Sequence, residues 1–148
     1  MSFDVGDEVV YPHHGGAVVV AREAREAFGE TSEYLVLEPV IGELSLNVRA
    51  DRTDAGGIRE VVSADEGDDV FDLLRREVTR EPSNWSRRFK NHEEKLKSGD
   101  VYEVAEVVRN LSVRDQVKGV SACEKKLLGT ARQILVSELI LALKEDRT

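Results

Sequence analysis

Short apolar runs separated by glycine, proline and polar residues fill the first 62 positions of the chain. In residues 44–49 leucine and valine alternate strictly with polar residues, so this strand has one apolar and one polar face. Pro12 and Pro39 close two of the runs, and Gly15-Gly16 marks a turn. Strands are predicted at residues 9–11, 17–21, 34–37, 44–49 and 58–62. Five short strands in this spacing favour a small SH3-like or Tudor-like β-barrel.

From residue 68 onward the apolar positions recur at the spacing of a helix. Helices are predicted at residues 68–77 and 85–97, then between Asp100 and Gly119, and finally over residues 121–144. Asp100 with Glu103, and Ser121 with Glu124, have the spacing of capping boxes. Gly129 is a candidate break in the last helix. The second half is therefore expected to be a compact, all-α domain.

The change of period predicts an α+β protein with two domains, residues 1–64 and 65–148. The small and acidic segment 63–67 is the expected boundary between them. A chain of 148 residues with 41% hydrophobic and 34% charged positions is long enough for two small cores. No stretch of 18 apolar residues and no signal-peptide pattern occurs, and Cys123 is the single cysteine. These features predict a cytoplasmic protein.

The two halves of the chain differ in charge, which the net charge of −8 for the whole chain does not show. Residues 1–65 hold five basic and thirteen acidic side chains, whereas the remaining 16 basic and 16 acidic side chains cancel. Within the second half, residues 75–97 hold eight basic side chains and four acidic ones. Such asymmetry indicates that the halves meet different partners.

None of the chemically reactive residues forms a catalytic or metal-binding pattern. Adjacent His13 and His14 point to opposite sides of an extended segment. Gly15-Gly16 lacks the lysine and hydroxyl residue of a phosphate loop, and Cys123 has no histidine placed beside it in the sequence. The sequence therefore predicts neither an enzyme nor a cofactor.

The segment at residues 84–90 carries the most informative pattern. The only tryptophan, Trp85, stands at the start of a predicted helix and is followed by Arg87, Arg88 and Lys90. Two interpretations are open: the ring fills the core between helices, or it contacts a nucleic acid while the cations hold phosphates.

Several segments resemble the CarD/CdnL family of bacterial transcription regulators, in particular its actinobacterial members. The first is Val9-Val10-Tyr11-Pro12-His13-His14-Gly15, with Glu33-Tyr34-Leu35-Val36-Leu37 after it. The second half carries Glu81-Pro82-Ser83-Asn84-Trp85-Ser86-Arg87-Arg88-Phe89-Lys90 and Ala131-Arg132-Gln133-Ile134-Leu135. The resemblance extends over essentially the whole chain.

This resemblance implies a Tudor-like domain that binds the β subunit of RNA polymerase and a helical domain that contacts promoter DNA just upstream of the −10 element. By position, Trp85 corresponds to a wedge in the minor groove that stabilises the open complex, with phosphate contacts from Arg87, Arg88 and Lys90. Arg25 corresponds to a polymerase-contacting arginine. The polymerase-facing strand departs from the family, with Asn47 where relatives have arginine and Val48-Arg49 where they have Val-Pro. Arg49 is the candidate to replace the missing charge.

The expected function is thus that of a monomeric, non-enzymatic regulator that binds polymerase and promoter DNA together without a cofactor. The alternative is an adaptor that binds only proteins, with a helical domain that meets a second protein. Exposure of Trp85 discriminates between them, because an indole buried in the core favours the adaptor.

Overall fold

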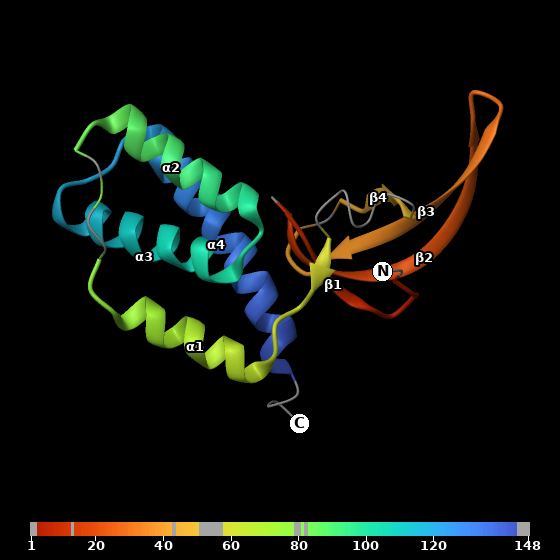
Figure 1. The fold of residues 1–148 in the computed structure, drawn as a ribbon, viewed down its shortest axis with the longest axis horizontal. Coiled ribbons are helices and arrows are strands. Elements are labelled where there is room, and N and C mark those ends of the chain that lie inside the picture. Colours follow the sequence, from red (N-terminus) through yellow and green to blue (C-terminus); the bar gives the residue numbers. More distant parts are fainter. Residues whose placement is uncertain are drawn as a thin grey trace.

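The computed structural model describes residues 3–12, 14–42, 44–50, 58–78, 81 and 83–144. Within these ranges a five-stranded sheet is followed by four helices, so the expected α+β class is confirmed. The sheet and the helices form two separate bodies that meet along the last helix (Figure 1). The prediction for His13 falls outside the described residues.

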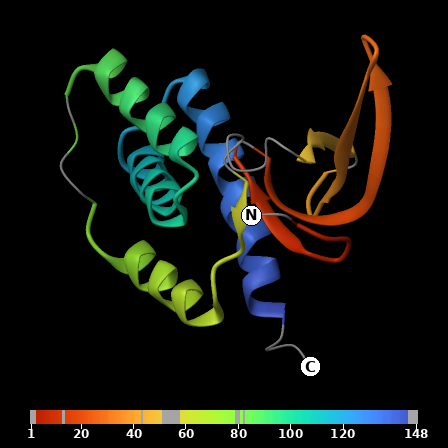
Figure 2. The same ribbon diagram turned by 45° about the vertical axis from the view of Figure 1, so that its right-hand side comes forward.

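The sheet is antiparallel throughout, with strand order β4-β3-β2-β1-β5. Its strands are β1 (Glu8–Tyr11), β2 (Gly15–Ala27), β3 (Glu30–Pro39), β4 (Leu46–Arg49) and β5 (Arg59–Glu60). The pairing of β2 with β3 slips between Val19 and Ala21, which marks a β-bulge. Beyond the bulge the two strands continue as a curved ribbon that projects away from the helices (Figure 2).

All five strands differ from their predicted bounds, β2 and β3 by the most, since β3 spans Glu30–Pro39 rather than residues 34–37. β2 extends six residues past the predicted end at Ala21, because the polar residues that follow still pair with β3. β4 begins at Leu46 rather than at Leu44, whose side chain is 81% exposed and takes no part in the core. Alternation alone could not find the end of β2, since a ribbon that is exposed on both faces needs no apolar positions.

The helices are α1 (Ala64–Arg75), α2 (Trp85–Ser98), α3 (Val101–Val117) and α4 (Ala122–Leu143). α1 begins four residues before the predicted start, because Ser63 and Glu66 form a capping box. The predicted capping box of Ser121 and Glu124 opens α4. Gly129 does not interrupt α4, since a helix with buried faces tolerates one glycine.

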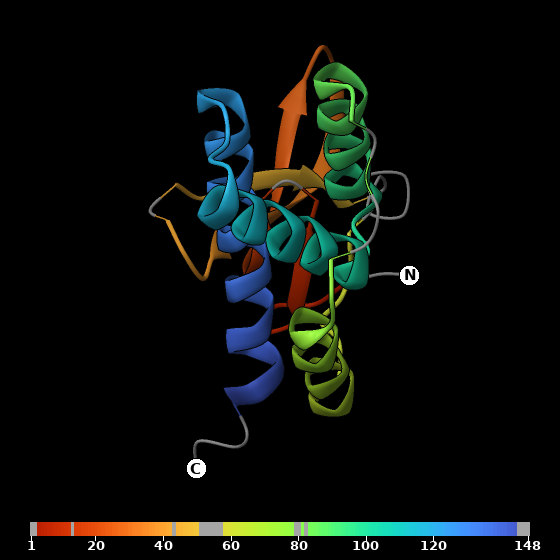
Figure 3. The same cartoon turned by 90° about the vertical axis from the view of Figure 1, so that its left-hand side faces the viewer.

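Each body has its own apolar core. The sheet core includes Val9, Val19, Leu35, Leu37 and Val48, all buried. The helical core gathers residues from all four helices, among them Val70, Leu96, Val107, Leu111 and Leu135. Figure 3 shows α3 crossing α4, with α1 and α2 on either side of it.

α4 joins the two bodies, because its C-terminal half packs against β2. The backbone N–H of Gly16 donates to Ser137 Oγ at 2.7 Å. A Cβ at Gly16 would lie 2.7 Å from the Ser137 carbonyl oxygen, which is closer than real contacts allow. Only a glycine at this position therefore lets β2 come so close to α4. The sequence pattern predicts a turn at this glycine pair, but both glycines already belong to β2 and pair with Tyr11 and Val10 of β1. The pattern does not show the close approach to α4 either.

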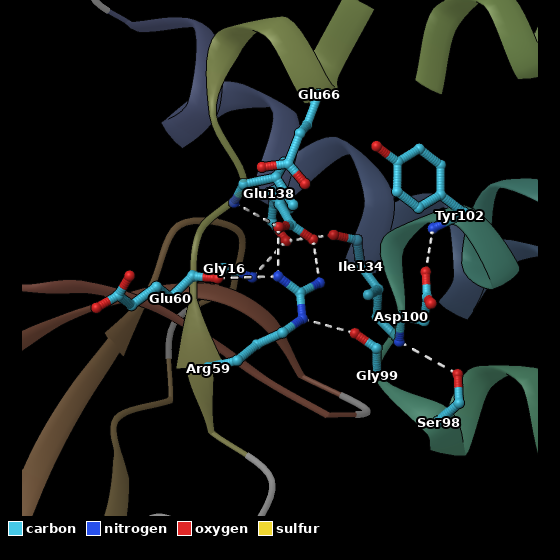
Figure 4. Close-up of polar contacts among 12 residues, drawn as sticks. Gly16, Arg59, Glu60, Glu66, Ser98, Gly99, Asp100, Tyr102, Ile134 and Glu138 are labelled. Carbon is cyan, nitrogen blue, oxygen red and sulfur yellow. Dashed lines mark hydrogen bonds and ion pairs between the residues drawn. The ribbon is translucent and has the colours of Figure 1, made fainter. Parts of the chain in front are cut away.

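An ion pair also links the sheet to α4 (Figure 4). Glu138 on α4 is 1% exposed. Its carboxylate accepts hydrogen bonds from both terminal nitrogens of Arg59 on β5, at 2.7 and 2.6 Å. Arg59 Nε also donates to the Gly99 carbonyl oxygen at 2.7 Å, so one guanidinium connects the sheet with two helical segments. Bidentate pairs of this kind are directional as well as strong, which favours one relative orientation of the domains.

Candidate functional site

Trp85 is the first residue of α2, and the residue is 43% exposed. Asn84 caps the helix by accepting a hydrogen bond from the Arg87 N–H at 3.0 Å. The indole stacks on Phe89, one turn further on, with ring centroids 5.3 Å apart. Its N–H donates to Glu124 Oε1 at 3.0 Å and lies 3.3 Å from Ser121 Oγ. The indole is therefore held by its N–H and by its stacking on Phe89, and the residue remains partly exposed to solvent.

Glu124 is the residue that holds this site together. It is 1% exposed at the N-terminal turn of α4, where one carboxylate oxygen accepts from Trp85 and the other from Arg88 Nε at 3.2 Å. Burial raises the pKa of Glu124, but the hydrogen bonds from Arg88 and Ser121 outweigh it and hold the pKa below its ordinary value. The carboxylate thus stays charged at neutral pH, and the positive end of the α4 dipole favours the same state.

The structure buries Arg88, whereas the phosphate contact predicted for it needs an exposed side chain. Its side chain is 4% exposed and points from α2 toward α4, where it pairs with Glu124. In the free chain this guanidinium links α2 to α4. The spacing of the basic residues could not reveal this, because the partner carboxylate lies 36 positions further along the chain.

Arg87 and Lys90 lie on the exposed face of α2, where phosphate contacts remain possible. Other cations of the basic segment are engaged in ion pairs, Arg75 with Asp72 and Lys95 with Glu106, each at 3.3 Å. The positive surface available around Trp85 is therefore smaller than the count of basic residues indicates.

Three of the four residues expected to meet polymerase, Arg25, Asn47 and Arg49, share one face of the sheet. Tyr34 on β3 pairs with Glu23 on one side and Arg49 on the other, and cross-strand partners point to the same face. Arg25 and Asn47, two residues from these partners along their strands, share that face as well. The Arg25 guanidinium lies 5.7 Å from the centre of the Tyr34 ring, within the range of a cation–π contact. We refer to Arg25, Tyr34, Asn47 and Arg49 as the docking face.

Val48 does not belong to the docking face. It pairs with Leu35, and its side chain is 8% exposed in the sheet core. Only its backbone remains for a partner, because β4 is an edge strand in the strand order. Edge strands offer unpaired N–H and C=O groups that a second sheet can extend.

The other chemically reactive side chains form no site in the described part of the chain. His14 stacks on Tyr11 with ring centroids 5.0 Å apart, and Cys123 is an exposed free thiol. Over the described residues there is no group of three or more His, Cys, Asp or Glu side chains that could hold a metal ion. None of the described helices is long and apolar enough to cross a membrane.

Two residues of these surfaces were missed by sequence reasoning. Glu124 was read only as a capping residue, and nothing near it in the sequence points to Trp85, 39 positions away. Tyr34 was assigned to a strand without a role on its outer face. Its place could have been inferred from the alternation with buried Leu35, but its neighbours Arg25 and Arg49 follow only from the strand pairing.

The structure thus combines a small antiparallel sheet that has a polar outer face with a helical body in which Trp85 is partly exposed. Comparison with known protein families shows which family the chain belongs to. The family model described as "CarD-like/TRCF RID domain" matches residues 3–62. A second family model, described as "CarD, C-terminal domain", matches residues 69–148. The chain belongs to the CarD family, whose members are non-enzymatic transcription factors, and its first domain is of the RNA polymerase-interacting type.

A relative from Bacillus subtilis supports this assignment. The chain is 31% identical over 137 residues to the protein described as "Putative transcription factor YdeB". The match covers 93% of this chain and 90% of that protein, so it includes both domains.

Proposed function

We propose that the protein binds the β subunit of RNA polymerase through its sheet and promoter DNA at the upstream edge of the transcription bubble through Trp85. The tryptophan props open the minor groove and so stabilises the open complex. Arg87 and Lys90 contact phosphates beside it. On the polymerase side, Arg25, Asn47 and Arg49 make the contacts, and the backbone of β4 adds to a strand of the partner.

The observation that carries this proposal is the partly exposed indole of Trp85. A residue that only filled the core would be covered, whereas Trp85 is 43% exposed while its indole N–H is hydrogen-bonded. A wedge needs this combination, because a ring that is fixed at one edge loses little further freedom when it enters a base step. The exposure favours DNA contact over an adaptor that binds only proteins.

Weak DNA binding is compatible with this function. The chain carries a net charge of −8, and few exposed cations surround Trp85, so the helical domain alone has low affinity for DNA. Attachment to polymerase raises the local concentration of the wedge at the promoter. Since unstacking a base step costs on the order of a few kcal/mol, the wedge acts where the step is already opening.

The test is Trp85→Ala in a competitor-trap assay of open-complex lifetime. The variant is expected to shorten the lifetime about tenfold, equivalent to a loss of ~1.4 kcal/mol in the open state, while polymerase affinity stays unchanged. Val136→Ala is the matched control, because Val136 on α4 is 45% exposed and apolar but distant in sequence from the basic segment. A folded Trp85→Ala domain with an unchanged lifetime would favour the adaptor instead.

A further inference from the structure

The tip of the β2–β3 ribbon carries an aromatic side chain that the fold does not need. Ala27 pairs with Glu30, so Phe28 and Gly29 form a two-residue turn, and both have positive φ, +52° and +79°. Such turns favour asparagine, aspartate or glycine, and a bulky aromatic residue is disfavoured there. Phe28 is nevertheless fully exposed, at 106% of its reference area.

We propose that Phe28 is an apolar anchor that inserts into a pocket on RNA polymerase at the far end of the docking face. This inference rests on the proposed binding of polymerase by the sheet and extends that contact to the ribbon tip. Neither burial nor backbone preference in the free protein favours phenylalanine at this position, so its contribution is expected in a complex. A lone, rigid aromatic ring is the type of residue that dominates binding energy at interfaces.

Continuity with the docking face identifies the occupant. Arg25 lies on β2, three residues before Phe28, and its cross-strand partner Ser32 belongs to β3 of the same ribbon. The ribbon projects away from the helical domain in both views, so the helices do not cover its tip (Figures 1 and 2). A partner that contacts Arg25 and follows the ribbon outward therefore reaches Phe28.

The charges around the tip define the chemistry of the pocket. Glu26 and Glu30 flank the turn, and the ribbon also carries Glu23 and Glu33, which are paired with Arg25 and Arg22. Carboxylates beside the anchor repel DNA phosphates, which excludes the promoter as the occupant. The complementary surface is an apolar pocket bordered by lysine or arginine side chains, on a protein.

The experiment measures the affinity of the full chain for RNA polymerase with Phe28→Asn, a residue that fits the left-handed turn. Burial of a phenylalanine side chain predicts a loss of roughly ten- to a hundredfold in affinity. The thermal midpoint is expected to stay equal or rise, because asparagine relieves the unfavourable φ. Val5→Asn, at another exposed apolar residue of the same domain, 57% exposed, is the control and is expected to bind as the wild type does.

Each outcome distinguishes the anchor from the docking proposal beneath it. Wild-type affinity of Phe28→Asn, together with a loss in Arg25→Glu, overturns the anchor and keeps the docking face. Failure of the wild-type chain to bind polymerase overturns both. If Phe28→Asn changes only the sedimentation of the free chain, a second copy is the occupant and the proposal is wrong. Charge reversal by Glu26→Lys is expected to weaken binding further, and tighter binding would contradict the cationic border.

Discussion

The Trp85 site and the docking face place their functional side chains by opposite means. At the Trp85 site, residues from the starts of α2 and α4 meet around one buried carboxylate, Glu124. On the docking face, side chains from β2, β3 and β4 lie together because antiparallel strands are in register. A surface built on a buried charge depends on the packing of the whole domain, whereas one built on strand register tolerates the loss of any single side chain.

The largest difference is expected from removal of the carboxylate itself. Glu124→Ala leaves the guanidinium of Arg88 buried without its partner, which typically costs about 3–5 kcal/mol. Total stability of a domain is only about 5–15 kcal/mol, so the helical domain is expected to lose a large part of its stability. Urea denaturation followed by the fluorescence of Trp85, the single tryptophan, measures this directly.

The matched variant for this test is Glu94→Ala, on the exposed face of α2. Its stability is expected to change by less than about 0.5 kcal/mol, as for other surface substitutions. Equal losses of stability in the two variants would show that the buried network around Glu124 stabilises the domain no more than an exposed carboxylate does. On the docking face, Arg25→Ala is expected to leave the denaturation midpoint unchanged, and a large loss there would remove the contrast between the two surfaces.

Two glycine substitutions compare Gly16, at the contact between β2 and α4, with Gly129, which has free space beside it in α4. Gly16→Ala places a Cβ 2.7 Å from the Ser137 carbonyl oxygen, and such overpacking costs about 1–3 kcal/mol. Gly129→Ala meets no atom within 4 Å and is expected to stabilise α4 by about 0.5–1 kcal/mol. Thermal melts of the two variants should therefore shift in opposite directions.

Loss of the joint has a second consequence that stability alone does not report. If strand β2 shifts away from α4, the docking face and Trp85 no longer keep their relative orientation. Gly16→Ala is then expected to shorten the open-complex lifetime while each domain still binds its own partner. A lifetime equal to that of the wild type would show that the relative orientation of the domains is not used.

Acid is expected to weaken the helical domain before the sheet. The pKa of Glu124 lies below its ordinary value, and so does that of Glu81, which burial raises but the hydrogen bond to His92 lowers. A carboxyl group with a depressed pKa in the folded state contributes stability above its unfolded value of about 4.3, and that stability is lost as the pH falls through the folded value. Stability measured by Trp85 fluorescence is expected to decline below about pH 4–5 and to be constant toward neutrality.

The Glu124→Gln variant sharpens the pH test, because it removes the titrating group while keeping its shape. Its stability at neutral pH is expected to be lower than that of the wild type, and its decline in acid shallower. Parallel pH profiles for the two proteins would assign the acid sensitivity to other carboxylates.

The smallest effect is expected at the exposed cations of α2. Arg87→Ala and Lys90→Ala leave folding unchanged, but each removes about one phosphate contact, which lowers the slope of log affinity against log salt concentration by about 1. Binding to promoter DNA at several salt concentrations measures the slope. Unchanged slopes in both variants would assign these side chains to solvent.

Arg88→Ala is the informative comparison for that series. Because Arg88 is buried beside Glu124, its removal is expected to destabilise the domain through an unpaired carboxylate rather than alter the salt slope. A change in slope with unchanged stability would show that Arg88 reaches the DNA and that the buried pair opens in the complex.

Local sequence determined the class of the fold, the four helices with their caps at Asn84, Asp100 and Ser121, and the polar face that Asn47 shares with Arg49. These features depend on residues within a turn or on a strict period of two, and so can be seen in a single segment. Tertiary structure decided the rest: the burial of Arg88 against Glu124, the length of β2 beyond its apolar run, and the approach of Gly16 to Ser137. In each case the partner lies on a different element, 36 residues away for Arg88 and 121 for Gly16, and only packing in three dimensions brings the two together.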